Sequence, residues 1–162
     1  MFSSLFLSKN QKLVKKWTHE HEEIMILIHK VLAEYSKNHH KQAKKLLKLL
    51  NNAIIDHVTH ENIVFYKLLK DKKGVSNQNK NSIEEFIESF KEMRLDLMRF
   101  LTEHTKEDSI LDDEFFNILN EVADVLQERI NFEEHNLYQL LNNSYKDEKR
   151  KEKEWEKIKK SY

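Results

Sequence analysis

The sequence contains no proline, no cysteine and a single glycine. All-β folds depend on proline and glycine at their turns, so this composition argues against such a fold. The lack of cysteine excludes disulfides, thiolate metal sites and cysteine nucleophiles, and it suits a reducing compartment. No apolar run is long enough to span a membrane, and the stretch MFSSLFLSKN is a poor signal peptide because no basic residue precedes its short apolar patch. We therefore expect a cytoplasmic protein that does not interact with membranes.

Neither sign of charge is in excess, because 28 basic residues face 28 acidic residues. Proteins that bind nucleic acids usually carry a clear basic excess, so we expect no nucleic-acid partner. The sequence also lacks a glycine-rich phosphate loop and a plausible grouping of nucleophile and base, which predicts that the protein is not an enzyme. What dominates is Lys, Glu, Leu, Asn and Ile, a composition that favours helices.

Four segments show the helical pattern in which apolar residues recur three and four positions apart. They cover about residues 10–37, 41–70, 83–104 and 112–145. The stretch DKKGVSNQNKNS before the third segment reads as a loop, and Ser82 with Glu85 is predicted to form the capping box of that helix. Such segments with short connections predict an all-α fold, an antiparallel up-down four-helix bundle.

This bundle is expected to occupy residues 10–145, between an N-terminal extension at 1–9 and a charged C-terminal tail at 146–162. The apolar stripe of each helix predicts its contribution to the core. The predicted core residues are Leu13, Trp17, Ile24, Ile28, Val31 and Tyr35 in the first helix; Ala43, Leu46, Leu50, Ile54, Phe65 and Leu68 in the second; Ile83, Phe86, Phe90, Met93, Leu97 and Phe100 in the third; and Phe115, Ile118, Val122, Leu126, Leu137 and Leu140 in the fourth.

Polar residues interrupt three of these stripes. His21 lies in the first stripe, His57 and Glu61 lie four apart in the second, and Arg129 and Glu133 lie four apart in the fourth. A buried carboxylate without a partner is costly, so two of them require positive charge nearby. A metal ion is one solution, because imidazole and carboxylate suit iron, zinc or manganese; a buried arginine is the other.

Three stretches carry these polar residues: HEHEEI at residues 19–24, LLNNAIIDHVTHENIVFYKLL at 49–69 and LQERINFEEHNLYQLL at 126–141. They resemble the first, second and fourth helices of hemerythrin-like (HHE cation-binding) proteins, and the resemblance covers nearly the whole chain from Lys12 to Leu141. It implies a four-helix bundle that holds non-haem iron.

The resemblance implies which residues would bind the metal. His21 stands where the family has its ligand on the first helix, and His57 and Glu61 stand where it has the pair on the second, with Glu61 as the bridging carboxylate. One of Glu133 and Glu134 stands where the family has a carboxylate on the fourth helix, and the phase of the apolar stripe favours Glu133.

Other positions depart from the family. Phe86 and Phe90 stand where the family has histidine on the third helix, and Arg129 stands where it has histidine ahead of the fourth-helix carboxylate. A cationic arginine repels a metal ion, so Arg129 is predicted to replace a metal through a salt bridge with Glu133. We expect a reduced site with one iron or no metal instead of a full di-iron centre. The protein would then be a non-catalytic sensor or regulator that binds a metal ion or small ligand in the bundle core.

A second resemblance leads to an alternative hypothesis. KLVKKWTHEHEEIMILIHKVLAEY at residues 12–35 and EFFNILNEVADVLQERINFEEHNLYQLL at 114–141 are similar to the first and last helices of the Rsd/AlgQ family of bacterial anti-sigma proteins. The similarity rests on scattered apolar positions together with Trp17, Arg129 and Glu133. It implies a metal-free regulator whose protein partner is a sigma factor.

Overall fold

The computed structural model describes residues 8–70 and 76–141, together with residues 153 and 157. Four α-helices follow one another: α1 (Lys9–Ser36), α2 (His40–Lys70), α3 (Asn77–Thr105) and α4 (Asp113–Phe132). A π-helical turn, η2 (Glu133–Leu137), extends α4, and the helix then continues to residue 141. No strand occurs among the described residues. The structure confirms the predicted all-α four-helix architecture.

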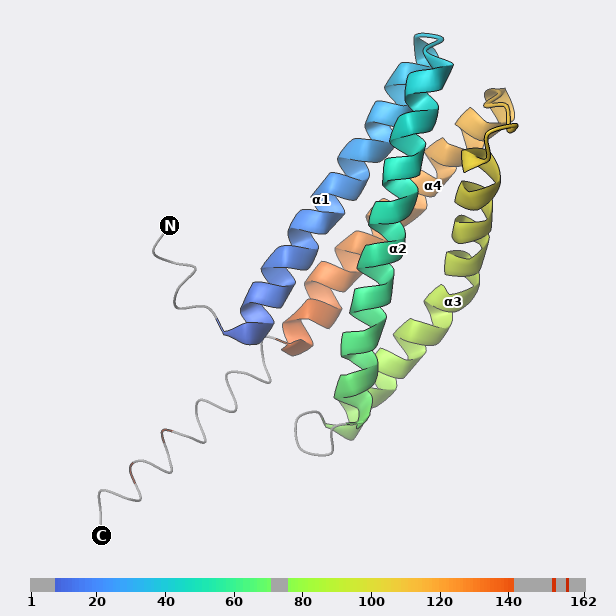
Figure 1. Cartoon of the computed structure of the whole chain (residues 1–162). Coiled ribbons are helices and arrows are strands. Elements are labelled where there is room, and N and C mark those ends of the chain that lie inside the picture. Colours follow the sequence, from blue (N-terminus) through green and yellow to red (C-terminus); the bar gives the residue numbers. More distant parts are fainter. Residues whose placement is uncertain (1–7, 71–75, 142–152, 154–156, 158–162) are drawn as a thin grey trace.

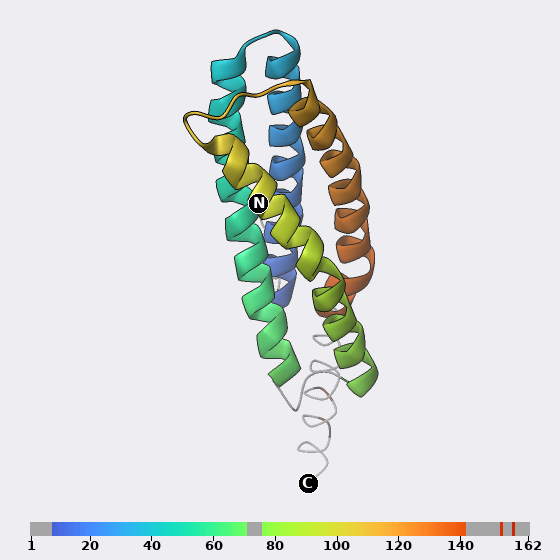
Figure 2. The same ribbon diagram turned by 90° about the vertical axis from the view of Figure 1, so that its right-hand side faces the viewer.

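The helices form an elongated antiparallel bundle (Figure 1). Helices α1 and α2 run side by side, α4 packs against α1, and α3 packs against α2 at an oblique angle that is clear in Figure 2. The tight turn between α1 and α2 places Asn38 in the left-handed region with φ of 61°, and its amide donates to the carbonyl oxygen of Tyr35 at 2.9 Å. Asparagine is one of the few residues that tolerate this conformation.

Side-chain caps fix where the first and last helices begin. Ser8 forms a capping box with Gln11: the Gln11 amide donates to Ser8 Oγ at 3.0 Å, and the Ser8 amide donates to Gln11 Oε1 at 2.9 Å. At the start of α4, Asp112 Oδ1 accepts from the Phe115 amide at 2.9 Å. These caps satisfy backbone amides that have no partner within the helix.

The predicted start of the third helix is wrong. Helix α3 begins at Asn77, where Ser76 Oγ accepts from the Asn79 amide at 3.2 Å. Ser82 lies inside the helix and donates to the Gln78 carbonyl oxygen at 3.1 Å, so it does not cap it. The asparagines in this first part of α3 are weak helix formers, but an N-cap at Ser76 offsets that preference.

The predicted N-terminal extension and C-terminal tail lie almost entirely outside the described residues. Among the described residues, no helix is long and apolar enough to cross a membrane.

The buried apolar residues form two clusters, one toward each end of the bundle. The larger cluster includes Ile28, Leu50 and Leu119, and the smaller includes Trp17 and Phe65. Several predicted core residues are only partly buried: Leu13, Tyr35, Leu46, Leu68 and Leu140. Neighbours that the stripes omitted are buried in the core: Leu32, Leu47, Leu101, Leu119, Tyr138 and Leu141.

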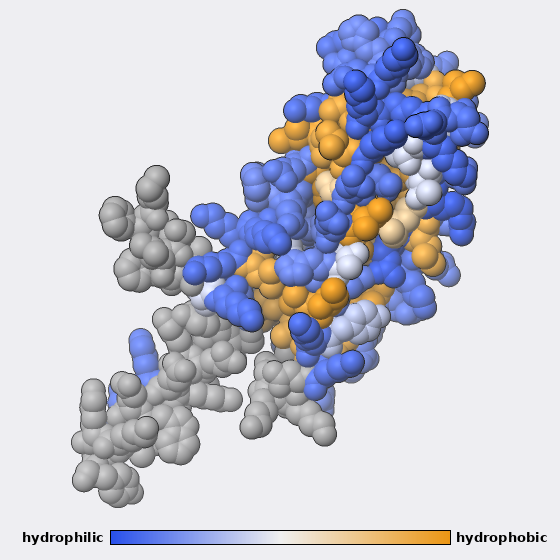
Figure 3. All heavy atoms as spheres, viewed as in Figure 1, coloured by the Kyte–Doolittle hydropathy of each residue, from blue (hydrophilic) through white to orange (hydrophobic). Residues whose placement is uncertain are grey.

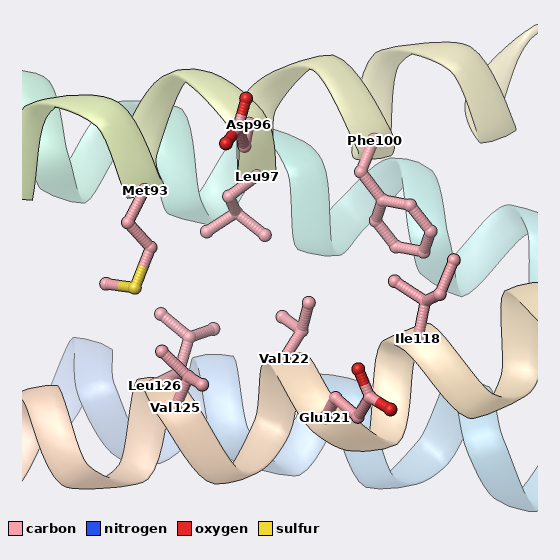
Figure 4. A pocket seen from close by; sticks show the side chains of 9 residues that line it. All are labelled: Met93, Asp96, Leu97, Phe100, Ile118, Glu121, Val122, Val125 and Leu126. Atoms are coloured by element: carbon pink, nitrogen blue, oxygen red, sulfur yellow. The ribbon is translucent and has the colours of Figure 1, made fainter.

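Helices α3 and α4 contact each other near both ends of α3 and separate between them. Phe86 stacks on Phe132 at 5.7 Å between ring centroids, and Phe100 stacks on Phe115 at 5.6 Å. Between these contacts lies an open, mainly apolar cleft of about 540 Å³ (Figure 4). Of the predicted core residues that line this cleft, four are only partly buried, because α3 diverges from α4: Met93, Phe100, Ile118 and Val122.

Candidate metal centre

Four polar side chains meet inside the bundle. His21 comes from α1, His57 and Glu61 come from α2 one turn apart, and Glu133 lies at the start of η2. Each is at most 5% exposed, and one nitrogen or oxygen atom from each lies within 4.8 Å of those of the others. The structure therefore brings together the four residues that the sequence proposes as metal ligands.

Carboxylates at the edge of the cluster orient both imidazole rings. His21 Nδ1 lies 3.0 Å from Glu134 Oε1, and His57 Nδ1 lies 2.8 Å from Glu20 Oε2. Both glutamates are partly exposed, at 27% and 25% of their side-chain surface. A carboxylate that accepts from Nδ1 fixes the tautomer and directs the Nε2 lone pair inward, which is the usual arrangement behind a metal-binding histidine.

The atoms that face the centre of the cluster need a cation between them. His21 Nε2 and His57 Nε2 are 2.9 Å apart, and carboxylate oxygens approach them, Glu133 Oε2 at 3.0 Å and Glu61 Oε2 at 3.3 Å. Two imidazole lone pairs at this distance repel unless a proton or a metal ion lies between them. Burial lowers the pKa of His57, but Glu61 and Glu20 outweigh it, and the pKa is raised overall.

Arg129 adds a fixed positive charge beside this cluster. Its Nε donates to Glu133 Oε1 at 3.0 Å, and its side chain is only 11% exposed. The guanidinium carbon lies 3.3 Å from the ring centroid of Phe86 and 4.0 Å from that of Phe90. Burial lowers the pKa of Arg129, with Glu133 opposing the shift, and the guanidinium remains charged at neutral pH. Both phenyl faces and one carboxylate therefore hold the cation in place.

Tyr138 completes the cluster from the same helix. Its hydroxyl donates to Glu61 Oε2 at 2.7 Å and lies 3.2 Å from His21 Nε2, and its ring stacks on that of His21 with an interplanar angle of 8°. Burial and the charges of Glu61 and Glu133 raise the pKa of Tyr138 far above its usual value. Its phenol is therefore neutral and acts as a hydrogen-bond donor.

The π-helical turn makes this convergence possible. In an α-helix, residues five apart point about 140° away from each other, so Glu133 and Tyr138 would not face the same site. In η2 the Tyr138 amide donates to the Glu133 carbonyl oxygen, which brings the two side chains onto the same side of the helix. Glu133 is 4% exposed inside the bundle, while Glu134 contacts His21 from the outside.

Comparison with known protein families fits this geometry. A family model described as the hemerythrin HHE cation-binding domain matches residues 12–141. The chain belongs to the hemerythrin HHE family. Comparisons with curated proteins and with solved structures gave no match.

The donor atoms of this hemerythrin HHE domain fit a metal ion. Two imidazole nitrogens and two carboxylate oxygens form a set that suits iron, zinc or manganese. The two carboxylates are buried with a single arginine beside them, so an ion would neutralise charge that the protein itself leaves in excess. His21, His57, Glu61 and Glu133 could therefore hold one.

The sequence did not predict several members of this hemerythrin HHE site. Glu20 and Glu134 were missed as partners of the histidines because they lie next to stripe positions in the sequence, outside the predicted apolar stripes. The stacking of Phe86 and Phe90 on Arg129 was not foreseen, although an arginine facing two aromatic positions is a recognisable signal. Tyr138 was missed because it joins the site through the π-turn.

Proposed function

We propose that this hemerythrin HHE domain binds a single metal ion of the non-haem iron type through His21, His57, Glu61 and Glu133. The observation that carries the proposal is the pair of imidazole Nε2 atoms, 2.9 Å apart and flanked by two buried carboxylates. An ion at this point would satisfy all four donors at once. The bound ion would supply a redox-active or Lewis-acidic centre, and the protein would hold it in a closed apolar interior.

The surroundings of Arg129 support one ion in preference to a di-iron centre. The guanidinium lies against Glu133 on the side of α4 that faces α3, where Phe86 and Phe90 cover it. A fixed cation repels a second metal ion, and the phenyl rings offer it no ligand. Arg129 would thus replace a second ion and neutralise Glu133 through a salt bridge.

A sensor or regulator role follows from how such an ion would act on stability. Without metal, Glu61 and Glu133 depend on Arg129, Tyr138 and the histidine proton for neutralisation. A ligand that binds only the folded state stabilises it in proportion to the logarithm of its concentration over its dissociation constant. Occupancy of the metal site would therefore change the stability of the bundle. A non-catalytic cytoplasmic regulator could use this change to alter its binding to a partner.

Metal analysis of the full chain tests this proposal. Protein stripped with a chelator would be loaded anaerobically with Fe(II), desalted and analysed for iron and protein. We expect about one iron per chain in the native protein and almost none in His57→Ala. His19→Ala is the matched control, because His19 lies on α1 with 69% of its side chain exposed, where it pairs with the surface residues Glu22 and Glu23.

Two outcomes would contradict the proposal. Two irons per chain would show that Arg129 does not exclude a second ion. No iron, zinc or manganese in the native protein would reject metal binding, and capture of a purified bacterial sigma factor by that metal-free protein would support the Rsd/AlgQ-like alternative.

A further inference from the structure

A groove with basic edges lies between the beginning of α1 and the end of α2. It measures about 520 Å³, and its apolar floor consists of Leu13, Val64 and Leu68. Four lysines surround the floor, Lys9, Lys12 and Lys16 from α1 and Lys67 from α2, and we call this feature the lysine groove. On the face formed by α1 and α2, hydrophobic surface emerges between hydrophilic residues (Figure 3). The lysine groove combines apolar surface with one sign of charge.

Its positive charge is only partly neutralised within the protein. Lys16 Nζ lies 3.5 Å from Glu20 Oε1. No acidic side chain among the described residues lies within ion-pair distance of Lys9, Lys12 or Lys67, and all three are exposed. The whole chain has a formal net charge of zero, so this cluster is a local excess of positive charge. An anionic partner would therefore gain electrostatic energy at Lys9, Lys12 and Lys67 without displacing an ion pair among the described residues.

We propose that the lysine groove binds an acidic amphipathic helix of a partner protein. The α1 lysines are spaced three and four residues apart, so they follow one face of the helix over about 10 Å. A partner helix laid along the groove would place apolar side chains every three or four residues on the floor. Its carboxylates would lie against the three lysines of α1 and against Lys67 of α2. A single anionic headgroup could not reach ammonium groups spread over this length and over two helices.

Two side chains, those of His60 and Trp17, connect the lysine groove with the metal cluster. His60 lines the groove, and its Nδ1 accepts from Trp17 Nε1 at 3.2 Å. Trp17 is fully buried, and its ring centroid lies 5.4 Å from that of Tyr138 and 6.5 Å from that of His57. Two rings, those of His60 and Trp17, would thus separate a partner in the groove from the proposed ligand His57. A role of the lysine groove in reporting the state of the metal site rests on the proposed regulatory function. The binding of an acidic helix does not rest on it.

A labelled peptide tests the binding directly. The probe is a fluorescein-labelled helical peptide of about four turns, with leucines at helical spacing and glutamates elsewhere, titrated with the metal-free full chain and followed by fluorescence anisotropy. We expect affinity that falls with salt and weakens about tenfold in Lys12→Gln/Lys67→Gln. The control, Lys45→Gln/Lys48→Gln, removes two exposed lysines from the other end of α2 and should change the affinity by less than about twofold.

A second readout places the peptide beside His60. The chain has two tryptophans, so Trp155→Phe leaves Trp17 as the only indole, and peptide binding should shift its emission. Unchanged Trp17 emission on binding would overturn the contact with His60. Three outcomes would overturn the proposed partner. The two double-lysine variants could weaken peptide binding equally, or a peptide with lysines in place of the glutamates could bind as tightly as the probe. The protein could also bind phosphatidylglycerol vesicles in preference to the peptide. Because the titration uses metal-free protein, its result is independent of whether the metal proposal holds.

Discussion

Replacing Arg129 with alanine should reveal how strongly the metal-free protein depends on a cation beside Glu133. The change removes the hydrogen bond from Nε to Glu133 Oε1 and the stacking of the guanidinium on Phe86 and Phe90. Glu133 and Glu61, each at most 5% exposed, would then share the interior with no permanent positive charge. The two carboxylates would then rely on the histidine proton and on the hydroxyl of Tyr138, which donates to Glu61.

The expected loss is large because the pair is buried. Removing one partner of a buried ion pair costs about 3–5 kcal/mol of unfolding free energy, whereas an exposed pair contributes about 0–1 kcal/mol. Arg99 and Asp96 form such an exposed pair, at 3.2 Å with both side chains 74% exposed. If unfolding free energy falls by about 2 kcal/mol per molar urea, Arg129→Ala should lower the urea midpoint by about 1.5–2.5 M.

The assay is urea unfolding of the full chain in a chelator, followed by circular dichroism at 222 nm. Arg99→Ala is the control and should leave the midpoint within about 0.5 M of the native value. Addition of metal should recover much of the stability of Arg129→Ala, because an ion would neutralise the carboxylates. A midpoint of Arg129→Ala as close to the native value as that of the control would refute the view that Arg129 neutralises the cluster.

Three further predictions concern the proposed ligand His57 and two neighbours of the ligands, Glu134 and Tyr138. Glu134→Gln should weaken metal affinity about 10–100-fold by releasing His21 Nδ1, and competition with a fluorescent chelator measures the change. The folded-state pKa of His57 is raised, so its proton stabilises the metal-free protein. This stabilisation is complete below the unfolded pKa of about 6.5, and it is lost as pH rises through the pKa of the folded state. The thermal midpoint without metal should therefore fall as pH rises above about 6.5, and the fall should flatten in His57→Gln. Tyr138→Phe removes the donor to Glu61 and should cost about 1–3 kcal/mol in urea unfolding without metal, while a native-like midpoint would show that the hydroxyl contributes nothing.

Helical periodicity predicted the parts of the protein that follow regular α-helix. Polar residues interrupt the apolar stripes of α1 and α2 at His21, His57 and Glu61, and the structure buries all three. Spacing is sufficient here because residues four apart share a face wherever the helix is regular. The family to which the chain belongs was also recognised from these helices and from α4.

Spacing could not reveal features that depend on irregular backbone or on helix placement. The π-turn moves Tyr138 into the site, and a pattern based on α-helix assigns it elsewhere. The separation of α3 from α4 leaves Met93 and Val122 at a cleft, although their positions in the stripes are those of core residues. The start of α3 at Asn77 was missed because two serines compete as caps and propensity alone does not choose between them.

Helix α3 is the one wall of the bundle that supplies none of the proposed ligands. Near the cluster, α3 contacts Arg129 through the rings of Phe86 and Phe90. The cleft separates the middle of α3 from α4. An outward swing of α3 would break aromatic contacts but leave all four donors on their own helices. An ion should therefore enter and leave when this helix opens. Amide hydrogen exchange in α3, which measures that opening, should occur at a rate that correlates with the rate of metal exchange.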